Sequence, residues 1–393
     1  MRRGVTLLEV LIAILVASVG LLGAIAVFPV AMSQAKKGQI ADVSAVAGES
    51  AIAAFKAQGM NERPRWLAWD QTNQQQVQVP ADFQESTSPY FGYSFCIDPM
   101  LFSHNAADDP ANGAVWSYFP AVPQTAGLRM MRLNLTSGNP VVPLQPMNEL
   151  QAAKWFSVED ELMYQRPEDD SLPAGQLFTT IDDNGTLKPA RRQEEGRLTW
   201  FATLVPKIDI LQSPIDAAGT ARLGDEYVLS IVVCRNRASG EAMHVNDPAN
   251  PEHPWNEWTA KILAADFHSA GIGGGEVTVT TNDPATDATF NKEEYLGLKS
   301  GQWVMLGRTI PGTAAAIQHY QWYRVSDAAE TLAVGNRWSQ EVSLVGGDWP
   351  ADMMPSQIVN GQKTLGDGTN DECDVMIMPT VVHVYERTIR LSQ

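Results

Sequence analysis

Cysteine is scarce in this sequence. The chain of 393 residues has three, Cys96, Cys234 and Cys373, and no two have the C-x-x-C spacing of zinc sites or redox motifs. Cys96 and Cys234 lie in strand-like runs, where a buried thiol packs as a small apolar group. We expect all three thiols to be free and buried. In an oxidising compartment, one pair could instead form a disulfide and leave one thiol over.

Positive charge is also in short supply. Lys and Arg number 28 against 45 Asp and Glu, which gives a formal net charge of −17. A protein that binds phosphate backbones needs a basic surface, so a nucleic-acid partner is not expected, even with Arg191 and Arg192 adjacent. A net negative charge of this size is typical of a globular domain that must stay soluble outside the cytoplasm.

Catalytic signatures are missing. The sequence has no G-x-S-x-G, HExxH or P-loop pattern, and "GIGGG" (271–275) precedes a strand-like run instead of opening a helix. His244 and His253 lie in a loop rich in Pro and Asn, which is a poor setting for zinc. We therefore expect a protein that is not an enzyme and has no cofactor.

Charge is absent from residues 10 to 32, and this run is preceded by Glu9. About 20 apolar residues can cross a bilayer as a helix, so we expect a transmembrane segment at about residues 10–32. A Sec signal peptide, with Arg2 and Arg3 before the run and cleavage near Ala26, is one alternative, and a plain membrane anchor is another. Both leave Glu9 unexplained, because a charge at membrane depth is costly and normally has a functional partner.

The segment "GVTLLEV" (4–10), followed by an apolar helix, resembles the class III signal of type IV prepilins and type II secretion pseudopilins. The resemblance implies that a prepilin peptidase removes the leader, residues 1–4, by cutting after Gly4, and that the new N-terminus, Val5, is methylated. It also implies that Glu9, the fifth mature residue, pairs with the terminal ammonium of a neighbouring subunit. Phe is the usual first mature residue, and Val5 departs from that pattern.

The same resemblance implies the partners and the location. Other pilin or pseudopilin subunits would contact the N-terminal helix, and an inner-membrane platform would assemble them. The protein would be single-pass in the inner membrane, with its head in the periplasm or outside the cell, and would enter a filament after assembly.

Major pseudopilins bind calcium in an acidic C-terminal loop, and this chain has a weak counterpart. Asp367, Asp371 and Asp374 surround a glycine turn before a strand-like run. Hard cations such as Ca²⁺ prefer several such oxygens, although the spacing is not that of an EF-hand. A plain turn that uses Asp and Asn for local hydrogen bonds is the alternative.

The N-terminal helix should extend well past the apolar run. No proline interrupts residues 33 to 56, and apolar side chains recur there at spacings of three and four, at Ile40, Val43, Ala47, Ala51, Ala54 and Phe55. Gly59 is a natural helix stop. The sequence thus predicts a pilin helix over residues 5–60, with an inner half that spans the membrane and an amphipathic outer half that packs on a head.

The head is predicted to be mainly antiparallel β, so the fold class is α+β. Strands are expected at 92–97, 198–205, 226–234, 276–281, 301–307, 320–326, 338–345 and 374–391. One helix is expected at 148–165, and the rest of 98–196 is expected to decorate the surface.

We divide the head into three parts. A globular part covers 61–275, an inserted small β meander or barrel covers 276–345, and a C-terminal loop and strand over 346–393 return to the head sheet. Trp303, Trp322 and Trp338 are expected in the core, and Pro379 predicts a bulge or an edge.

The sequence therefore predicts a structural pilin-like or pseudopilin subunit. Because the head is large, and bulky heads hinder a tight helical repeat, we expect a minor subunit of a type IV pilus or type II secretion pseudopilus. The alternative is a membrane-anchored periplasmic binding protein or enzyme whose N-terminal segment is uncleaved or is cut by signal peptidase.

Overall fold

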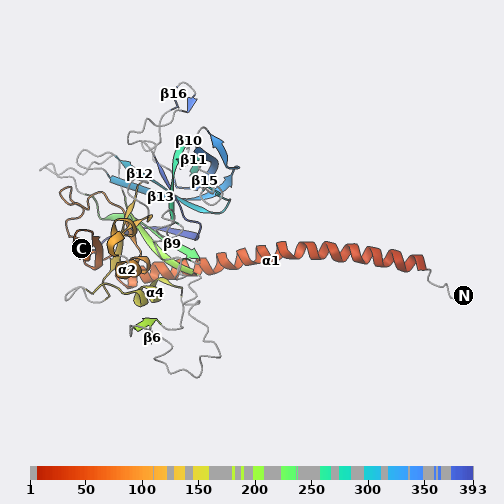
Figure 1. Ribbon diagram of the computed structural model, residues 1–393, viewed down its shortest axis with the longest axis horizontal. Coiled ribbons are helices and arrows are strands. Elements are labelled where there is room, and N and C mark those ends of the chain that lie inside the picture. Colours follow the sequence, from red (N-terminus) through yellow and green to blue (C-terminus); the bar gives the residue numbers. More distant parts are fainter. Residues whose placement is uncertain are drawn as a thin grey trace. The chain divides into compact units, whose positions relative to one another are not determined.

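A computed structural model describes residues 7–108, 110–121, 128–137, 145–158, 179–181, 187–189, 198–207, 223–235, 237, 257–266, 274–284, 296–310, 317–334, 337–347, 358–359, 362–363 and 373–392. The chain divides into two compact units, Met1–Val46 and Ala47–Gln393. Helix α1 (Leu7–Ala57) belongs to both and is the red ribbon in Figure 1.

Helix α1 ends where the sequence predicts. Gly59 takes the left-handed conformation, with φ of 61°, which a residue without a Cβ adopts at no steric cost. The amide of Met60 donates to the carbonyl of Phe55, as in a Schellman cap. Pro64 follows in a short 3-10 helix, η1 (Arg63–Arg65), and turns the chain into the first strand.

The first layer of the head is an eight-stranded sheet with the order β19-β9-β8-β3-β5-β1-β2, in which β4 also pairs with β5. Only the β3–β5 pairing is parallel among these described strands. Their bounds are β1 (Trp66–Asp70), β2 (Gln75–Gln78), β3 (Phe95–Ile97), β4 (Tyr118–Phe119), β5 (Met130–Leu135), β8 (Leu198–Pro206), β9 (Glu226–Arg235) and β19 (Val381–Arg390).

The outer part of α1 belongs to this layer. Ala47, Ala51 and Phe55 are buried, as the apolar stripe predicts, and Gly48 faces the ring of Tyr385 on β19. A Cβ at Gly48 would lie 2.1 Å from Cε2 of that ring, so the helix and the strand approach closely only because the residue is glycine.

Three short helices complete the layer. They are α2 (Pro99–Asp108), α3 (Gly113–Trp116) and α4 (Glu149–Phe156). Asn148 caps α4 by accepting a hydrogen bond from the Gln151 amide, while the Gln151 side chain accepts one from the Asn148 amide. This capping box fixes the start of the helix that the sequence predicts at 148–165, of which the part beyond residue 158 lies outside the described residues.

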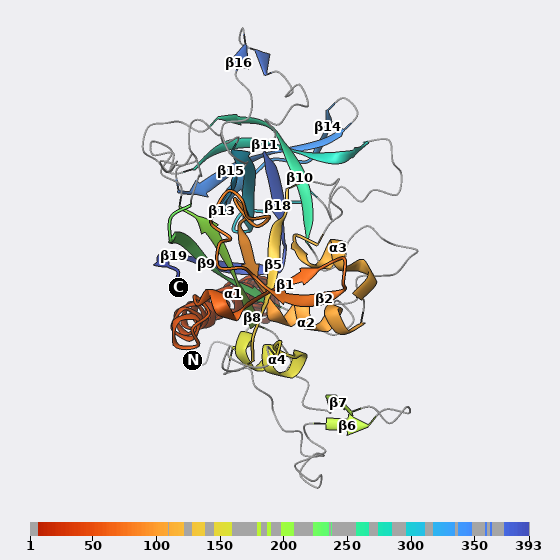
Figure 2. The same cartoon turned by 90° about the vertical axis from the view of Figure 1, so that its left-hand side faces the viewer.

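The second layer is a closed barrel of six antiparallel strands, in which β11 and β15 pair and complete the cycle β10-β11-β15-β13-β12-β18 (Figure 2). The barrel strands are β10 (Trp258–Asp266), β11 (Gly274–Pro284), β12 (Trp303–Ile310), β13 (Ile317–Ala328), β15 (Arg337–Gly346) and β18 (Asp374–Ile377). A short strand, β14 (Leu332–Val334), pairs with the start of β15.

Alternation along the barrel strands divides their side chains between two cores. Val304 and Leu306 of β12 belong to the cluster that fills the barrel, whereas Met305 packs with sheet residues such as Phe201. Trp322 of β13 also lies in this shared cluster. Apolar side chains therefore fill the interior of the barrel. Other apolar side chains on its outer surface pack against the eight-stranded sheet.

Two further hairpins are described, β6 (Thr179–Ile181) with β7 (Leu187–Pro189), and β16 (Ile358–Val359) with β17 (Gln362–Lys363). Neither pairs with the two larger sheets.

The structure changes the predicted outline of the head in three places. The barrel includes β10 and β18, which lie outside the predicted module of 276–345. These two strands, one before and one after that module in the sequence, connect β11 to β12 and close the barrel. The run 374–391 is two strands, and Pro379 lies in the turn where the chain leaves the barrel for the sheet edge. The expectation that residues 98 onward decorate the surface is wrong for α2 and β5, which supply buried side chains to the sheet core.

Candidate functional site: the N-terminal helix

The predicted processing and assembly residues lie at the very start of the chain. Gly4 and Val5 lie outside the described residues. Glu9 lies on α1, but the structure does not describe the placement of its side chain. Their roles in cleavage, methylation and pairing stay predictions.

The inner part of α1 exposes large apolar side chains all round the helix. Leu7 is 81% exposed, and Leu15 and Val16 are each more than 60% exposed. The other large apolar side chains of this segment that are described as exposed are Val10, Leu11, Ile12, Ile14, Leu21, Phe28 and Met32. Consecutive positions such as 10, 11 and 12 point in different directions at 100° per residue, so the described apolar side chains cover every face of the helix there. A helix that is apolar all round is stable only when other apolar groups surround it.

This exposure is concentrated on one element. Among the described large apolar residues that are exposed, all except Leu332 and Val345 lie on α1. Scattered exposed apolar residues are ordinary, whereas a continuous apolar surface marks a site of interaction. Among the described residues, the continuous exposed apolar surface therefore lies on the helix that follows the predicted cleavage site.

Among the described residues, no helix combines the length and the apolar composition needed to cross a membrane.

The acidic loop is only partly described. Asp367 and Asp371 lie outside the described residues, and Asp374 is buried at the start of β18. Its carboxylate forms an ion pair of 2.6 Å with Lys261 and accepts a hydrogen bond from the Leu128 amide. Within the described ranges, no group of three or more His, Cys, Asp or Glu is arranged to hold a metal ion. The calcium site stays a prediction.

All three cysteines are free and buried, which confirms the expectation for the thiols. Burial raises the pKa of the Cys234 thiol to about 12 and raises the pKa of the Cys96 thiol well above its ordinary value. Both thiols therefore stay protonated and act as packing groups in the core that the sheet and the barrel share.

Sequence reasoning missed a buried cluster of four charges. Arg132 of β5 donates to Asp98 and to Glu257, each at 2.6 Å. Arg237, just after β9, also donates to both carboxylates, at 2.5 and 3.1 Å. All four side chains are at most 4% exposed, so the two positive and two negative charges compensate one another away from water.

The cluster joins elements that are far apart in the chain. Asp98 precedes α2, and Glu257 precedes β10 of the barrel, so the ion pairs cross from the sheet to the barrel. Burial raises the pKa of Asp98, but Arg237 and Arg132 outweigh burial and hold the pKa below its ordinary value. One local signal was available, since an Asp before a Pro is typical of a helix start. No signal in the sequence indicated its partners.

Comparison with known proteins gives one finding. The family described as the prokaryotic N-terminal methylation motif matches residues 1–25. No curated protein matches the chain. The matched segment contains Gly4, Val5 and Glu9 and runs into the exposed apolar part of α1. The chain thus carries the N-terminal methylation motif, which is the class III signal peptide of type IV pilins and pseudopilins. The motif implies processing by a prepilin peptidase and assembly with other pilin subunits.

Proposed function

We propose that this protein is a minor subunit of a type IV pilus or a type II secretion pseudopilus. The peptidase cuts after Gly4, Val5 is methylated, and α1 then packs among the helices of other subunits. The observation that carries the proposal is the coincidence of the methylation motif with a helix that is apolar and exposed on every side. The subunit acts through assembly and not through catalysis.

The charge of Glu9 has a place in this scheme. Before assembly, the segment 10–32 lies in the inner membrane, where a carboxylate at the edge of the apolar run is costly. After assembly, the α-ammonium of Val5 of a neighbouring subunit neutralises Glu9, and the two desolvated charges offset each other. The pair would therefore favour the filament over the free subunit in the membrane.

The assignment to a minor subunit follows from the size of the head. The eight-stranded sheet and the six-stranded barrel together form a unit of about 350 residues beyond the first 46. Heads of this bulk limit how closely subunits can repeat along a filament, so we expect few copies, located at a tip.

Mass spectrometry of the N-terminus tests the proposal. Protein extracted from native membranes should begin with methylated Val5. A Gly4→Leu variant should keep Met1, because the side chain blocks a peptidase site that accepts glycine. Gly20→Leu is the matched control, since it changes a glycine outside the cleavage site and should still be cut after Gly4. Wild-type protein that retains Met1, or that is cut after Ala26, would contradict the proposal and favour an anchor or a Sec signal.

A further inference from the structure

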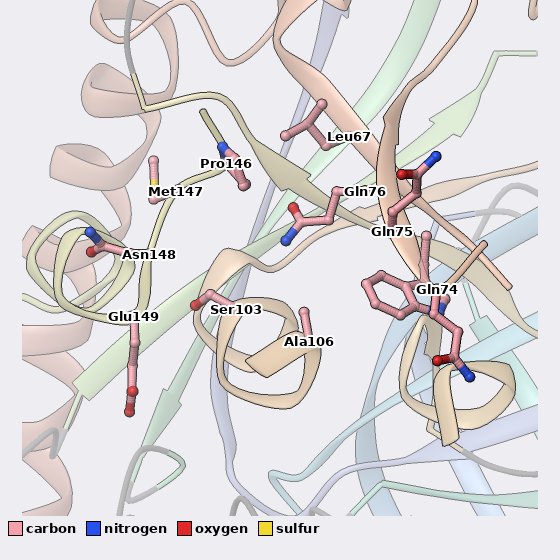
Figure 3. Close-up of a pocket in the computed structure, with 11 residues that line it drawn as sticks. Leu67, Gln74, Gln75, Gln76, Ser103, Ala106, Pro146, Met147, Asn148 and Glu149 are labelled. Atoms are coloured by element: carbon pink, nitrogen blue, oxygen red, sulfur yellow. The ribbon is translucent and has the colours of Figure 1, made fainter. Parts of the chain in front are cut away.

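A cleft of about 600 Å³ opens on the head between the β1–β2 hairpin, α2 and the start of α4 (Figure 3). Its volume lies within the range of about 300–1,000 Å³ that is typical of small-molecule sites. The described residues that line it are Leu67, Trp69, Gln74, Gln75, Gln76, Ser103, Ala106, Pro146, Met147, Asn148 and Glu149.

Register explains why the floor is both apolar and polar. Trp69 pairs with Gln76 across the hairpin, and Leu67 lies two residues before Trp69, so all three side chains share one face of the hairpin. Figure 3 shows Gln76 near Ser103 and Ala106 of α2, with Pro146, Met147 and Asn148 along one side. The cleft therefore offers aromatic and aliphatic side chains beside amide and hydroxyl groups.

Hydrogen bonds hold two walls in place and leave specific polar atoms for a ligand. Asn134, which is fully buried, donates through its side-chain nitrogen to the side-chain oxygen of Gln76 and to the carbonyl of Met147. Gln76 thus keeps its amide nitrogen as a donor. Asn148 uses its side-chain oxygen in the α4 cap and keeps its own amide nitrogen. Ser103 donates to Pro99 and keeps its oxygen as an acceptor.

The charge of the lining excludes several ligand classes. None of the described lining residues is basic, and the one acidic residue, Glu149, forms an ion pair with His104 at 3.4 Å. Phosphates, sulfates and acidic sugars would find no cationic partner in a chain whose net charge is −17. A cation would find a single carboxylate that is already paired.

We propose that this cleft binds an uncharged carbohydrate. A sugar hydroxyl both donates and accepts, which suits amide donors and a hydroxyl acceptor that lie close together. The C–H face of a sugar ring is apolar and can pack on the indole of Trp69, which is partly exposed in the cleft. Recognition of a neutral glycan would give the subunit a ligand-binding role besides assembly, and it does not depend on the proposed filament.

Saturation-transfer NMR on the full chain tests this proposal. The protein is kept in lauryldimethylamine oxide micelles, because that detergent has no sugar head group. The probes are maltotriose and triacetylchitotriose as neutral sugars, trigalacturonate as an acidic sugar and triglycine as a peptide, each at up to about 10 mM, which detects even weak sites. We expect at least one neutral sugar to bind and neither of the other two probes to bind.

Two variants locate the binding. Ala106→Leu fills the cleft and should weaken the affinity at least about tenfold, whereas Ala153→Leu, on α4 outside the cleft, should leave it unchanged. Gln76→Glu retains the oxygen that accepts from Asn134 but removes the donor, and should weaken binding at least about fivefold. Gln71→Glu is its matched control, because it makes the same charge change outside the cleft. The proposal is overturned if neither neutral sugar binds, or if trigalacturonate or triglycine binds more tightly than the neutral sugars. It is also overturned if Ala106→Leu and Gln76→Glu bind the sugar as tightly as the wild-type protein.

Discussion

The buried charge cluster allows a sharp prediction about how the sheet and the barrel are held together. Arg132→Met removes one of two cations and leaves Asp98 and Glu257 facing Arg237 alone, with one uncompensated negative charge in a site at most 4% exposed. Breaking a buried pair in this way costs about 3–5 kcal/mol. The unit Ala47–Gln393 has an unfolding entropy of about 0.7 kcal/mol/K, so the Tm of the head should fall by about 4–7 °C.

Differential scanning calorimetry measures this change, and two further variants interpret it. Adding Glu257→Leu to Arg132→Met restores charge balance, so the double variant should recover part of the lost stability. Recovery will be incomplete, because the Ala121 amide loses its acceptor on Glu257. Arg390→Met is the matched control, since Arg390 pairs with Glu226 at the exposed sheet edge and its removal should leave the Tm unchanged. An Arg132→Met variant as stable as the control, or additive effects in the double variant, would refute the reasoning.

Three other predictions follow from particular side chains. Gly48→Ala should destabilise the head by about 1–3 kcal/mol, as overpacking does, because its Cβ would lie 2.1 Å from the ring of Tyr385, whereas Gly38→Ala, with nothing within 4 Å, should not lower the Tm. Burial lowers the pKa of His319 to about 4, so between pH 6.5 and 4 the unfolded chain binds more protons than the folded chain. The free energy of unfolding should therefore decrease as the pH is lowered through that window, by up to about 1.4 kcal/mol per pH unit. In the His319→Gln variant this loss should disappear, which measuring the Tm as a function of pH will show. If the Tm of the variant falls with decreasing pH as steeply as that of the wild type, other groups cause the loss. Glu9→Leu should be cut and remain in the membrane but be absent from sheared filaments, because a neighbour's ammonium would be buried unpaired. Assembly equal to wild type would assign Glu9 another role.

Local patterns in the sequence determined several elements. Gly59 ends α1 because the left-handed conformation there is strongly favoured for glycine, and that requirement needs no knowledge of the fold. Runs rich in branched and aromatic residues gave β8, β9, β11, β12, β13 and β15 close to their observed bounds. The methylation motif at residues 1–25 was likewise readable, because peptidase recognition depends on a short linear segment.

Tertiary structure alone decided which strands pair and which buried groups meet. β5 contains Arg132 and Asn134, two polar side chains that argue against a central strand until their partners on distant segments are known. The barrel closes through β10 and β18, which are separated by more than 100 residues, and no local periodicity encodes such a pairing. The same holds for the cleft, whose walls come from the β1–β2 hairpin, α2 and α4. Sequence patterns record how a residue relates to its near neighbours, whereas ion pairs, barrel closure and clefts depend on contacts that exist only once the chain has folded.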